Sequence, residues 1–192
     1  MTALAAILIL VHLAAAVPPL PCEYYGPVTI DGSLAPPGTV ITATINGMPR
    51  GSVATTTAGV LGGLSVFDNR LVVSATERDI DALSRPIVNF TVNGVCTNGL
   101  TSSAFYSGET RYIALASRGL LAVPGMALKP TDPDQDGIFE DLNGNGRLDF
   151  ADVVLYFNQM TWISAYEPVC AFDLNGNGRI DFADIVALFN EI

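Results

Sequence analysis

The sequence DLNGNGRLDFAD at residues 141–152 occurs a second time, nearly unchanged, as DLNGNGRIDFAD at residues 173–184. Each copy runs directly into a short apolar segment, VVLYFNQM after the first and IVALFNEI after the second. A repeated unit usually buries its apolar face against its own copy. We therefore expect the two copies to form one small unit in which two loop–helix segments pack together.

Oxygen-bearing side chains recur at positions 1, 3, 5, 9 and 12 of each loop, counted from its first aspartate. Calcium takes about six to eight oxygen ligands at this spacing, with glycine at position 6 for a sharp turn and a backbone carbonyl at position 7. Mg²⁺ fits so flexible a loop less well. The predicted calcium ligands are Asp141, Asn143, Asn145, Arg147 (through its carbonyl), Asp149 and Asp152 in the first loop, and Asp173, Asn175, Asn177, Arg179 (through its carbonyl), Asp181 and Asp184 in the second.

A third acidic segment, DPDQDGIFED, lies directly upstream at residues 132–141. Its alternating aspartates are closed by Gly137 and followed by Glu140 and Asp141. The pattern looks like the start of another calcium loop fused to the first, with Asp141 open to sharing between two ions. The alternative is a solvated acidic linker. The predicted ligands of this third site are Asp132, Asp134, Asp136 and the carbonyl of Ile138.

The repeated loops resemble the type I dockerin, a module of two calcium-binding loop–helix units that typically has Asp at position 12, as at Asp152 and Asp184 here. The resemblance covers residues 132–192 and implies an all-α module with pseudo-twofold symmetry. It also implies docking onto a cohesin, a partner domain that gathers enzymes or surface proteins in extracellular complexes, often for polysaccharide breakdown.

Phenylalanine and alanine stand at loop positions 10 and 11, where dockerins often carry Ser or Thr. Matching apolar stripes follow on the two predicted helices. The stripes are Val153, Val154 and Phe157 in the first helix, and Ile185, Val186 and Phe189 in the second. We expect both stripes, with Phe150 and Phe182, to form the module's own core. Trp162 and Tyr166, between the repeats, either anchor a partner or close the gap to the preceding domain.

The net charge of −10 comes entirely from the C-terminal part of the chain. Residues 1–131 carry seven acidic and seven basic residues, whereas the remainder carries twelve acidic residues against Arg147 and Arg179. Without cations these carboxylates repel one another, so we expect folding of this part to depend on calcium. The acidity argues against nucleic acid as a partner, because nucleic acid requires a basic face.

An apolar run at residues 3–17 ends in three alanines and is followed by two prolines. This pattern is typical of a secretory signal peptide cleaved near Ala16. The run is short for a transmembrane span. No Lys or Arg precedes it, so retention as a membrane anchor is the alternative. We predict an extracellular or cell-surface location, where calcium reaches the concentrations that weak sites need.

Residues 22–122 show the period-two pattern of strands, from which we expect an Ig-like antiparallel β-sandwich. At residues 87–95, Val88, Phe90 and Val92 alternate with polar residues and should face the core. The other predicted strands are at residues 40–45, 51–57, 71–76, 101–107 and 111–116.

The chain has three cysteines, Cys22, Cys96 and Cys170, and export permits a disulfide. A bond between Cys22 and Cys96 would join the start of the sandwich to a later strand. Three pairings stay open from the sequence alone. Cys170 is expected to be a buried free thiol, with pairing to another chain as the alternative.

Little in the chain predicts catalysis. His12 is the only histidine and lies in the predicted signal peptide, so the mature chain has no His-based triad and no His-ligated zinc site. Acids of the middle segment, such as Glu23, Glu77 and Glu109, show no glycosidase-like arrangement. We therefore predict a protein that is not an enzyme.

Together these patterns predict a mostly β fold with a small α part, comprising a signal peptide at residues 1–17, an Ig-like sandwich at 22–122, a linker at 123–131 and an all-α dockerin-like module at 132–192. The predicted function is a secreted calcium-binding protein that docks its sandwich onto a cohesin-like or other scaffold, in association with glycoside hydrolases. One alternative is a structural or adhesin stalk with the module packed on its own sandwich. Another is a small carbohydrate-binding or carbohydrate-active protein with a glycan partner. A membrane contact is expected only if the N-terminal segment is retained.

Overall fold

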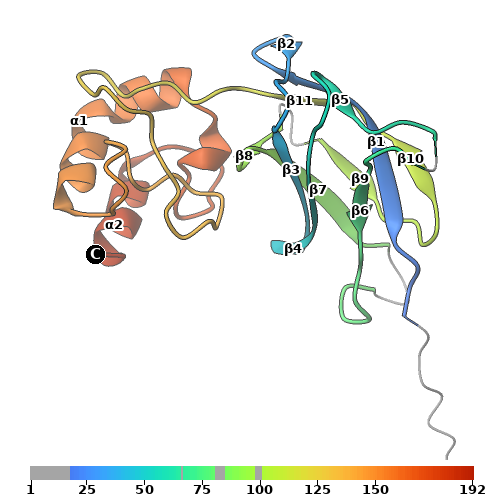
Figure 1. Ribbon diagram of the computed structural model, residues 1–192. Helices are drawn as coiled ribbons and strands as arrows, with labels where there is room; N and C mark the ends of the chain where they lie inside the picture. Colours follow the sequence, from blue (N-terminus) through green and yellow to red (C-terminus); the bar gives the residue numbers. More distant parts are fainter. Residues whose placement is uncertain (1–17, 66, 81–84, 98–100) are drawn as a thin grey trace, which may run out of the picture.

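The computed structural model describes residues 18–65, 67–80, 85–97 and 101–192. The predicted signal peptide at residues 1–17 lies outside the described residues. The described strands form two sheets, and the described helices follow them in the chain (Figure 1). Among the described residues, no helix is both long enough and apolar enough to cross a membrane.

The first sheet is organised around its longest strand, β1. This strand, β1 (Cys22–Ile30), pairs antiparallel with β2 (Ser33–Leu34), β5 (Val60–Leu61) and β6 (Leu71–Val73), and parallel with β10 (Thr110–Tyr112) and β11 (Leu115–Ser117). Gly26 lies in β1 between the segment that pairs with β10 and the segment that pairs with β11, and it has a φ of +147°. The backbone of Ile113 runs close beside Gly26. A Cβ at Gly26 would collide with the carbonyl oxygen of Ile113, so this close approach requires glycine.

The second sheet is antiparallel throughout. It contains β3 (Val40–Ile45), β4 (Met48–Ala54), β7 (Ile87–Val92), β8 (Val95–Cys96) and β9 (Ser102–Ala104). Asn46 and Gly47 form the tight turn between β3 and β4, both with positive φ, as a two-residue hairpin requires. Val88, Phe90 and Val92 are buried along β7, which confirms the predicted alternation of that strand.

The two sheets bury one common apolar core. Tyr24 and Leu71 come from the first sheet, and Ile41 and Phe90 from the second. The rings of Tyr24 and Phe90 meet edge to face, with centroids 5.0 Å apart. Apolar burial of this kind stabilises a fold without any bound ligand.

The C-terminal part is not the all-α module that the sequence predicts. Its regular elements are α1 (Phe150–Tyr166), the short 3₁₀ helix η1 (Val169–Ala171) and α2 (Phe182–Asn190). Irregular loops make up the rest, with one β-bridge between Thr131 and Asp141. The predicted fold class, an Ig-like sandwich followed by an all-α module, is therefore wrong. In the loops, Asp and Asn side chains bind the backbone N–H groups that a helix would need, so these segments do not become helical.

A second apolar core joins the C-terminal part to the second sheet. Val95 of β8 is buried in the same cluster as Phe139, Leu142 and Tyr156. Trp162 packs against this cluster and is half-buried. The cluster spans the sheet, the loops and both helices, so the C-terminal part rests directly on its own sheet domain.

A disulfide crosses the same boundary. Cys96 in β8 is bonded to Cys170 in η1, with Cα atoms 6.4 Å apart. Cys22 is a free thiol, fully buried in the core between the sheets. Of the three pairings that the sequence left open, the structure has Cys96–Cys170, and the expectation that Cys170 is a free thiol is wrong. Cys22 lies on the opposite sheet with its side chain in that core.

Candidate metal centres

Each repeated loop folds around its first aspartate. Asp141 accepts a hydrogen bond from the N–H of Asn145 at Oδ1 (3.1 Å) and from the N–H of Gly146 at Oδ2 (2.7 Å). The same two bonds, at 3.0 and 2.7 Å, form on Asp173 in the second loop. Gly146 has a φ of +84°, so the sharp turn expected at position 6 is present.

The asparagines at positions 3 and 5 are held in the same way. Asn143 Oδ1 accepts the N–H of Asn145 at 3.1 Å, and Asn145 Oδ1 accepts the N–H of Arg147 at 2.9 Å. Asn175 and Asn177 accept the equivalent bonds at 3.0 and 2.9 Å. Oxygens at positions 1, 3 and 5 are thus fixed by N–H groups of their own loop. The arginines at position 7 are exposed, which leaves only their carbonyls to serve as ligands.

The aspartates at positions 9 and 12 connect the first loop to α1. Asp152 accepts the N–H of Asn143 at 3.1 Å and the side-chain amide of the same residue at 2.7 Å, both at Oδ1. Its Oδ2 accepts the N–H of Asp149 at 3.0 Å, and Asp149 caps the helix by accepting the N–H of Ala151 at 2.8 Å. This reciprocal capping box fixes where α1 begins.

The second loop repeats this arrangement bond for bond. Asp184 binds the N–H and side-chain amide of Asn175 at 3.1 and 2.7 Å, and binds the N–H of Asp181 at 2.7 Å. Asp181 caps α2 through the N–H of Ala183 at 2.9 Å. The duplicated sequence therefore folds into duplicated loops, and both helices begin at loop position 10.

The carboxylates of the loops suit a hard cation. Asp141, Asp152 and Asp184 are 0% exposed, and among the described residues none of them forms an ion pair with Arg or Lys. Burial raises the pKa of Asp152. A buried charge is costly unless it is paired or binds a metal. The donors are all oxygens, which Ca²⁺ prefers and most transition metals do not. Among the described residues, however, the acidic side chains that lie close enough together to hold a metal are those of residues 132–140, not those of the repeated loops.

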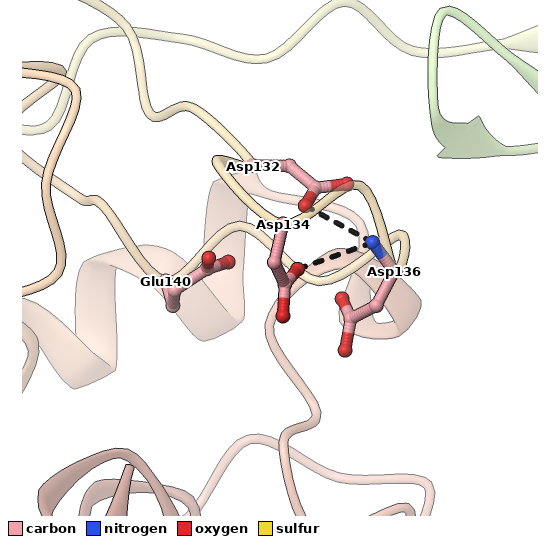
Figure 2. Close-up of side chains that lie close together, drawn as sticks. All are labelled: Asp132, Asp134, Asp136 and Glu140. Atoms are coloured by element: carbon pink, nitrogen blue, oxygen red, sulfur yellow. Dashed lines mark hydrogen bonds between the residues drawn. The ribbon is translucent and has the colours of Figure 1, made fainter. Parts of the chain in front are cut away.

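The acidic loop, residues 132–140, reproduces the first half of this pattern (Figure 2). Asp132 accepts the N–H of Asp136 at 3.2 Å and that of Gly137 at 2.9 Å, as position 1 does in the repeated loops. Asp134 Oδ1 also accepts the N–H of Asp136 at 3.2 Å, and Asp136 Oδ1 accepts that of Ile138 at 2.7 Å. The three predicted aspartates are thus brought together.

The structure adds a fourth carboxylate that the predicted ligand set lacks, that of Glu140. One carboxylate oxygen from each residue lies within 4.8 Å of the others in the cluster Asp132, Asp134, Asp136 and Glu140. Glu140 is 6% exposed, and its Oε2 has no hydrogen-bond partner. Counting from Asp132 as position 1 places Glu140 at position 9, a signal that the sequence already contained.

Asp141 does not join this cluster. Its carboxylate belongs to the first repeated loop and also accepts a hydrogen bond from Thr131 Oγ1. The backbones of Thr131 and Asp141 pair at the base of the acidic loop. Asp141 is therefore not shared between two sites. Glu140 belongs to the acidic loop, and Asp141 belongs to the first repeated loop.

Negative charge is concentrated at the acidic loop. Burial raises the pKa of Glu140 to about 7, and the neighbouring charges of Asp134, Asp132 and Asp136 raise it as well. Burial also raises the pKa of Asp132. Among the described residues, none of the four carboxylates forms an ion pair with Arg or Lys.

An open cleft of about 790 Å³ separates the acidic loop from the second sheet. Thr42 and Thr44 of β3 line one wall, and Asp132, Asp134 and Asp136 line the other. The threonines alternate with buried residues along β3, so they lie on the sheet face opposite the core. Solvent therefore reaches the three aspartates from the cleft side.

The phenylalanines of the two repeats are on the surface, which corrects the prediction that they form the module's core. The exposed fractions are 60% for Phe150, 60% for Phe157, 58% for Phe182 and 56% for Phe189. Val154 and Val186 beside them are also exposed. We call these six residues the phenylalanine patch. Only Val153 and Ile185 of the predicted stripes are buried, because each helix packs on the second core through the face that carries these two residues and leaves the face with the other valines and the phenylalanines in solvent.

The patch has the symmetry of the repeats. Phe150 meets Phe189 and Phe157 meets Phe182, each pair edge to face with ring centroids 6.4 Å apart. Each pair joins position 10 of one repeat to position 17 of the other. The two pairs are therefore equivalent under exchange of the repeats, and together they place four aromatic rings across α1 and α2.

Comparison with known proteins identifies no family. A scan of the sequence against protein-family models finds no match, and a search of curated proteins finds no similar sequence. Function is therefore inferred from the loops, the cleft and the phenylalanine patch.

Proposed function

We propose that residues 132–192 form a calcium-dependent docking module, similar in its loop–helix repeats to type I dockerins. The module attaches the sheet domain to an extracellular or cell-surface scaffold protein with a cohesin-like apolar face. The role is one of binding rather than catalysis, with enzymes of polysaccharide breakdown as proposed neighbours on the scaffold.

The phenylalanine patch is the observation that carries this proposal. Exposed apolar patches of this kind mark interaction sites on soluble proteins, and aromatic side chains dominate the binding energy of many interfaces. Loop position 11 and helix position 18, beside the patch, hold Ala151 and Asn158 in one repeat and Ala183 and Asn190 in the other. These four positions are uncharged, and the patch itself consists of apolar side chains, which favours an apolar partner surface over a charged one.

The loops determine the geometry of the patch. Asp149 and Asp181 fix the first turns of α1 and α2, immediately before Phe150 and Phe182. Buried Tyr156 donates its hydroxyl proton to the carbonyl of Phe172, next to the first ligand of the second loop. A bound calcium ion supplies the positive charge that the buried carboxylates lack. Calcium binding and partner binding are therefore linked.

The disulfide supports the proposed location. Disulfides persist in oxidising compartments and are rare in the cytosol. The bond between Cys96 and Cys170 joins the sheet domain to the C-terminal part, as expected for a protein that works outside the cell.

The test is binding of the full chain to a panel of cohesin-like domains, measured by calorimetry in calcium and in chelator. The double variant Phe157→Ala/Phe189→Ala should weaken binding by at least about 30-fold, since interface hot spots contribute about 2 kcal/mol or more each. Tyr112→Ala is the matched control, because Tyr112 is an exposed aromatic residue of β10 in the sheet domain and lies outside the patch. Equal binding by the double variant, or binding that is unaffected by chelator, would contradict the proposal.

A second candidate function is a self-contained stalk, in which the C-terminal part serves only to extend and stiffen its own sheet domain. Two contacts favour it: the disulfide between Cys96 and Cys170, and the hydrogen bond from the N–H of Leu121 to Glu167 at 3.0 Å. Under this function the chain stays monomeric and binds no scaffold, and the Phe157→Ala/Phe189→Ala variant has no binding phenotype. Sedimentation of the chain with and without scaffold domains separates the two functions.

A further inference from the structure

We propose that the acidic loop is a third calcium site, with Asp132, Asp134, Asp136 and Glu140 as its carboxylate ligands. This site stands on its own four carboxylates and does not rest on the docking function.

The decisive feature is the buried glutamate. A solvated acidic linker would leave all its carboxylates in water, and Asp134 and Asp136 are indeed exposed. Glu140 is instead only 6% exposed, and its Oε2 accepts no hydrogen bond. The other members of the cluster are carboxylates, which cannot donate a hydrogen bond to Glu140 when they are ionised. A cation at the centre of the four groups satisfies this oxygen, whereas a solvated linker does not.

The irregular loop favours calcium over magnesium. The four carboxylate oxygens lie within 4.8 Å of one another, so one cation can contact all four. Calcium accepts about six to eight oxygen ligands in flexible geometry, whereas magnesium demands a near-ideal octahedron and usually keeps several of its waters. The donors are all oxygen, so metals that prefer nitrogen or sulfur ligands are not favoured.

The fold completes the site from two sides. Glu140 approaches from the buried side, where Phe139 beside it packs in the second core. Asp132, Asp134 and Asp136 approach from the wall of the cleft. The carbonyl of Ile138, at position 7 of this loop, is the expected fifth protein ligand. The ion is therefore reachable through the cleft and exchanges with solvent calcium.

The experiment counts calcium ions bound to the full chain, with its disulfide intact, by native mass spectrometry and calorimetric titration with CaCl₂. The wild-type chain should bind three ions. Glu140→Gln keeps the size of the side chain, and Asp134→Ala removes an exposed ligand together with its oxygen, which an asparagine would keep, as at position 3 of the repeated loops. Each should weaken one site by at least about tenfold, since even the loss of a residue behind the ligands costs about 10–100-fold in metal affinity.

Glu77→Gln is the matched control, because Glu77 is an exposed acid of the sheet domain; it should keep all three ions. Asp184→Asn should lose the second-loop ion and retain the acidic-loop ion, which separates this inference from the repeated loops. A calcium count and affinity that neither Glu140→Gln nor Asp134→Ala reduces below those of the wild-type chain would overturn the third site. Magnesium binding as tight as calcium binding would overturn the choice of metal.

Discussion

The two halves of the molecule bury different chemistry. Between the sheets, the buried side chains are apolar, as Ile41, Leu71 and Phe90 show. In the C-terminal part, the buried groups include the carboxylates of Asp141 and Asp152. Apolar burial stabilises a fold by itself, whereas the loop carboxylates, although they accept hydrogen bonds, carry negative charges that repel one another until a cation neutralises them. The sheet domain should therefore keep its fold without calcium, and the C-terminal part should not.

Removing the disulfide is expected to have the largest effect on stability, because the bond ties the two halves together. Cys96 and Cys170 are 74 residues apart, and closing a loop of that length is worth about 4 kcal/mol on the chain-entropy account. We expect Cys96→Ala/Cys170→Ala to lower the free energy of unfolding by about that amount. Denaturant unfolding in saturating calcium measures the loss.

Cys22→Ala controls for the loss of a thiol, since Cys22 is free and the disulfide stays intact in that variant. If the double variant unfolded at the same denaturant concentration as the wild type, the bond would not hold the halves together.

The next largest effect should come from a position-12 aspartate. Asp184→Asn removes a buried charge from the second loop, and we expect it to lose one calcium ion. At free calcium about 100 times the dissociation constant, one ion contributes roughly 2.7 kcal/mol to stability. Thermal unfolding in calcium should show this loss, and most of it should vanish in chelator. An equal loss in both conditions would mean that Asp184 acts through its hydrogen bonds alone.

Tyr156→Phe tests how the two repeats are connected within the C-terminal part. Tyr156 is fully buried on α1, and its hydroxyl donates to the carbonyl of Phe172. Removing the hydroxyl leaves a buried carbonyl unpaired, at a cost of about 1–3 kcal/mol. We expect weaker calcium binding in the second loop, measured by titration, with the first loop less affected. Unchanged affinity in both loops would show that this hydrogen bond does not couple helix and loop.

The repeated loops were predictable because their ligands are contiguous in sequence. The aspartates of the acidic loop were predictable for the same reason, because they lie within five residues of one another. The sequence pattern does not single out Glu140, because Glu140 forms an acidic pair with Asp141, although its position number matches a ligand position. The duplicated hydrogen bonds of Asp141 and Asp173 follow from identical local sequence and need no information from the rest of the fold.

The surface and the disulfide were not predictable in this way. Val153 and Val154 are both apolar, and only the packing of α1 against the second core decides that Val153 is buried and Val154 is exposed. The pairing of Cys96 with Cys170 depends on where η1 lies against β8. The all-α prediction failed because it rested on the two repeats alone, whereas much of the C-terminal part is irregular chain, with a β-bridge between Thr131 and Asp141.

The smallest expected effect is on the stability of the sheet domain at acidic pH. Arg50 forms two hydrogen bonds to Asp79, at 2.6 and 2.8 Å. These bonds first, and those from Thr76 second, hold the pKa of Asp79 well below its ordinary range. Because the folded pKa is the lower one, the stabilisation is complete above the unfolded pKa of about 3.9 and is lost as pH falls below it.

Asp79→Asn should remove this part of the acid sensitivity while leaving calcium binding unchanged. Thermal unfolding between about pH 5 and pH 2 compares the variant with the wild type. Identical pH profiles for the two proteins would show that the Arg50–Asp79 pair adds nothing to stability.

The most direct test of the difference between the halves is hydrogen–deuterium exchange on the full chain, in calcium and after chelation. We predict that amides of residues 141–192 lose protection without calcium, while those of β3 and β7 keep theirs. Undiminished protection throughout residues 141–192 in chelator would contradict the claim that calcium holds this part of the protein in its fold.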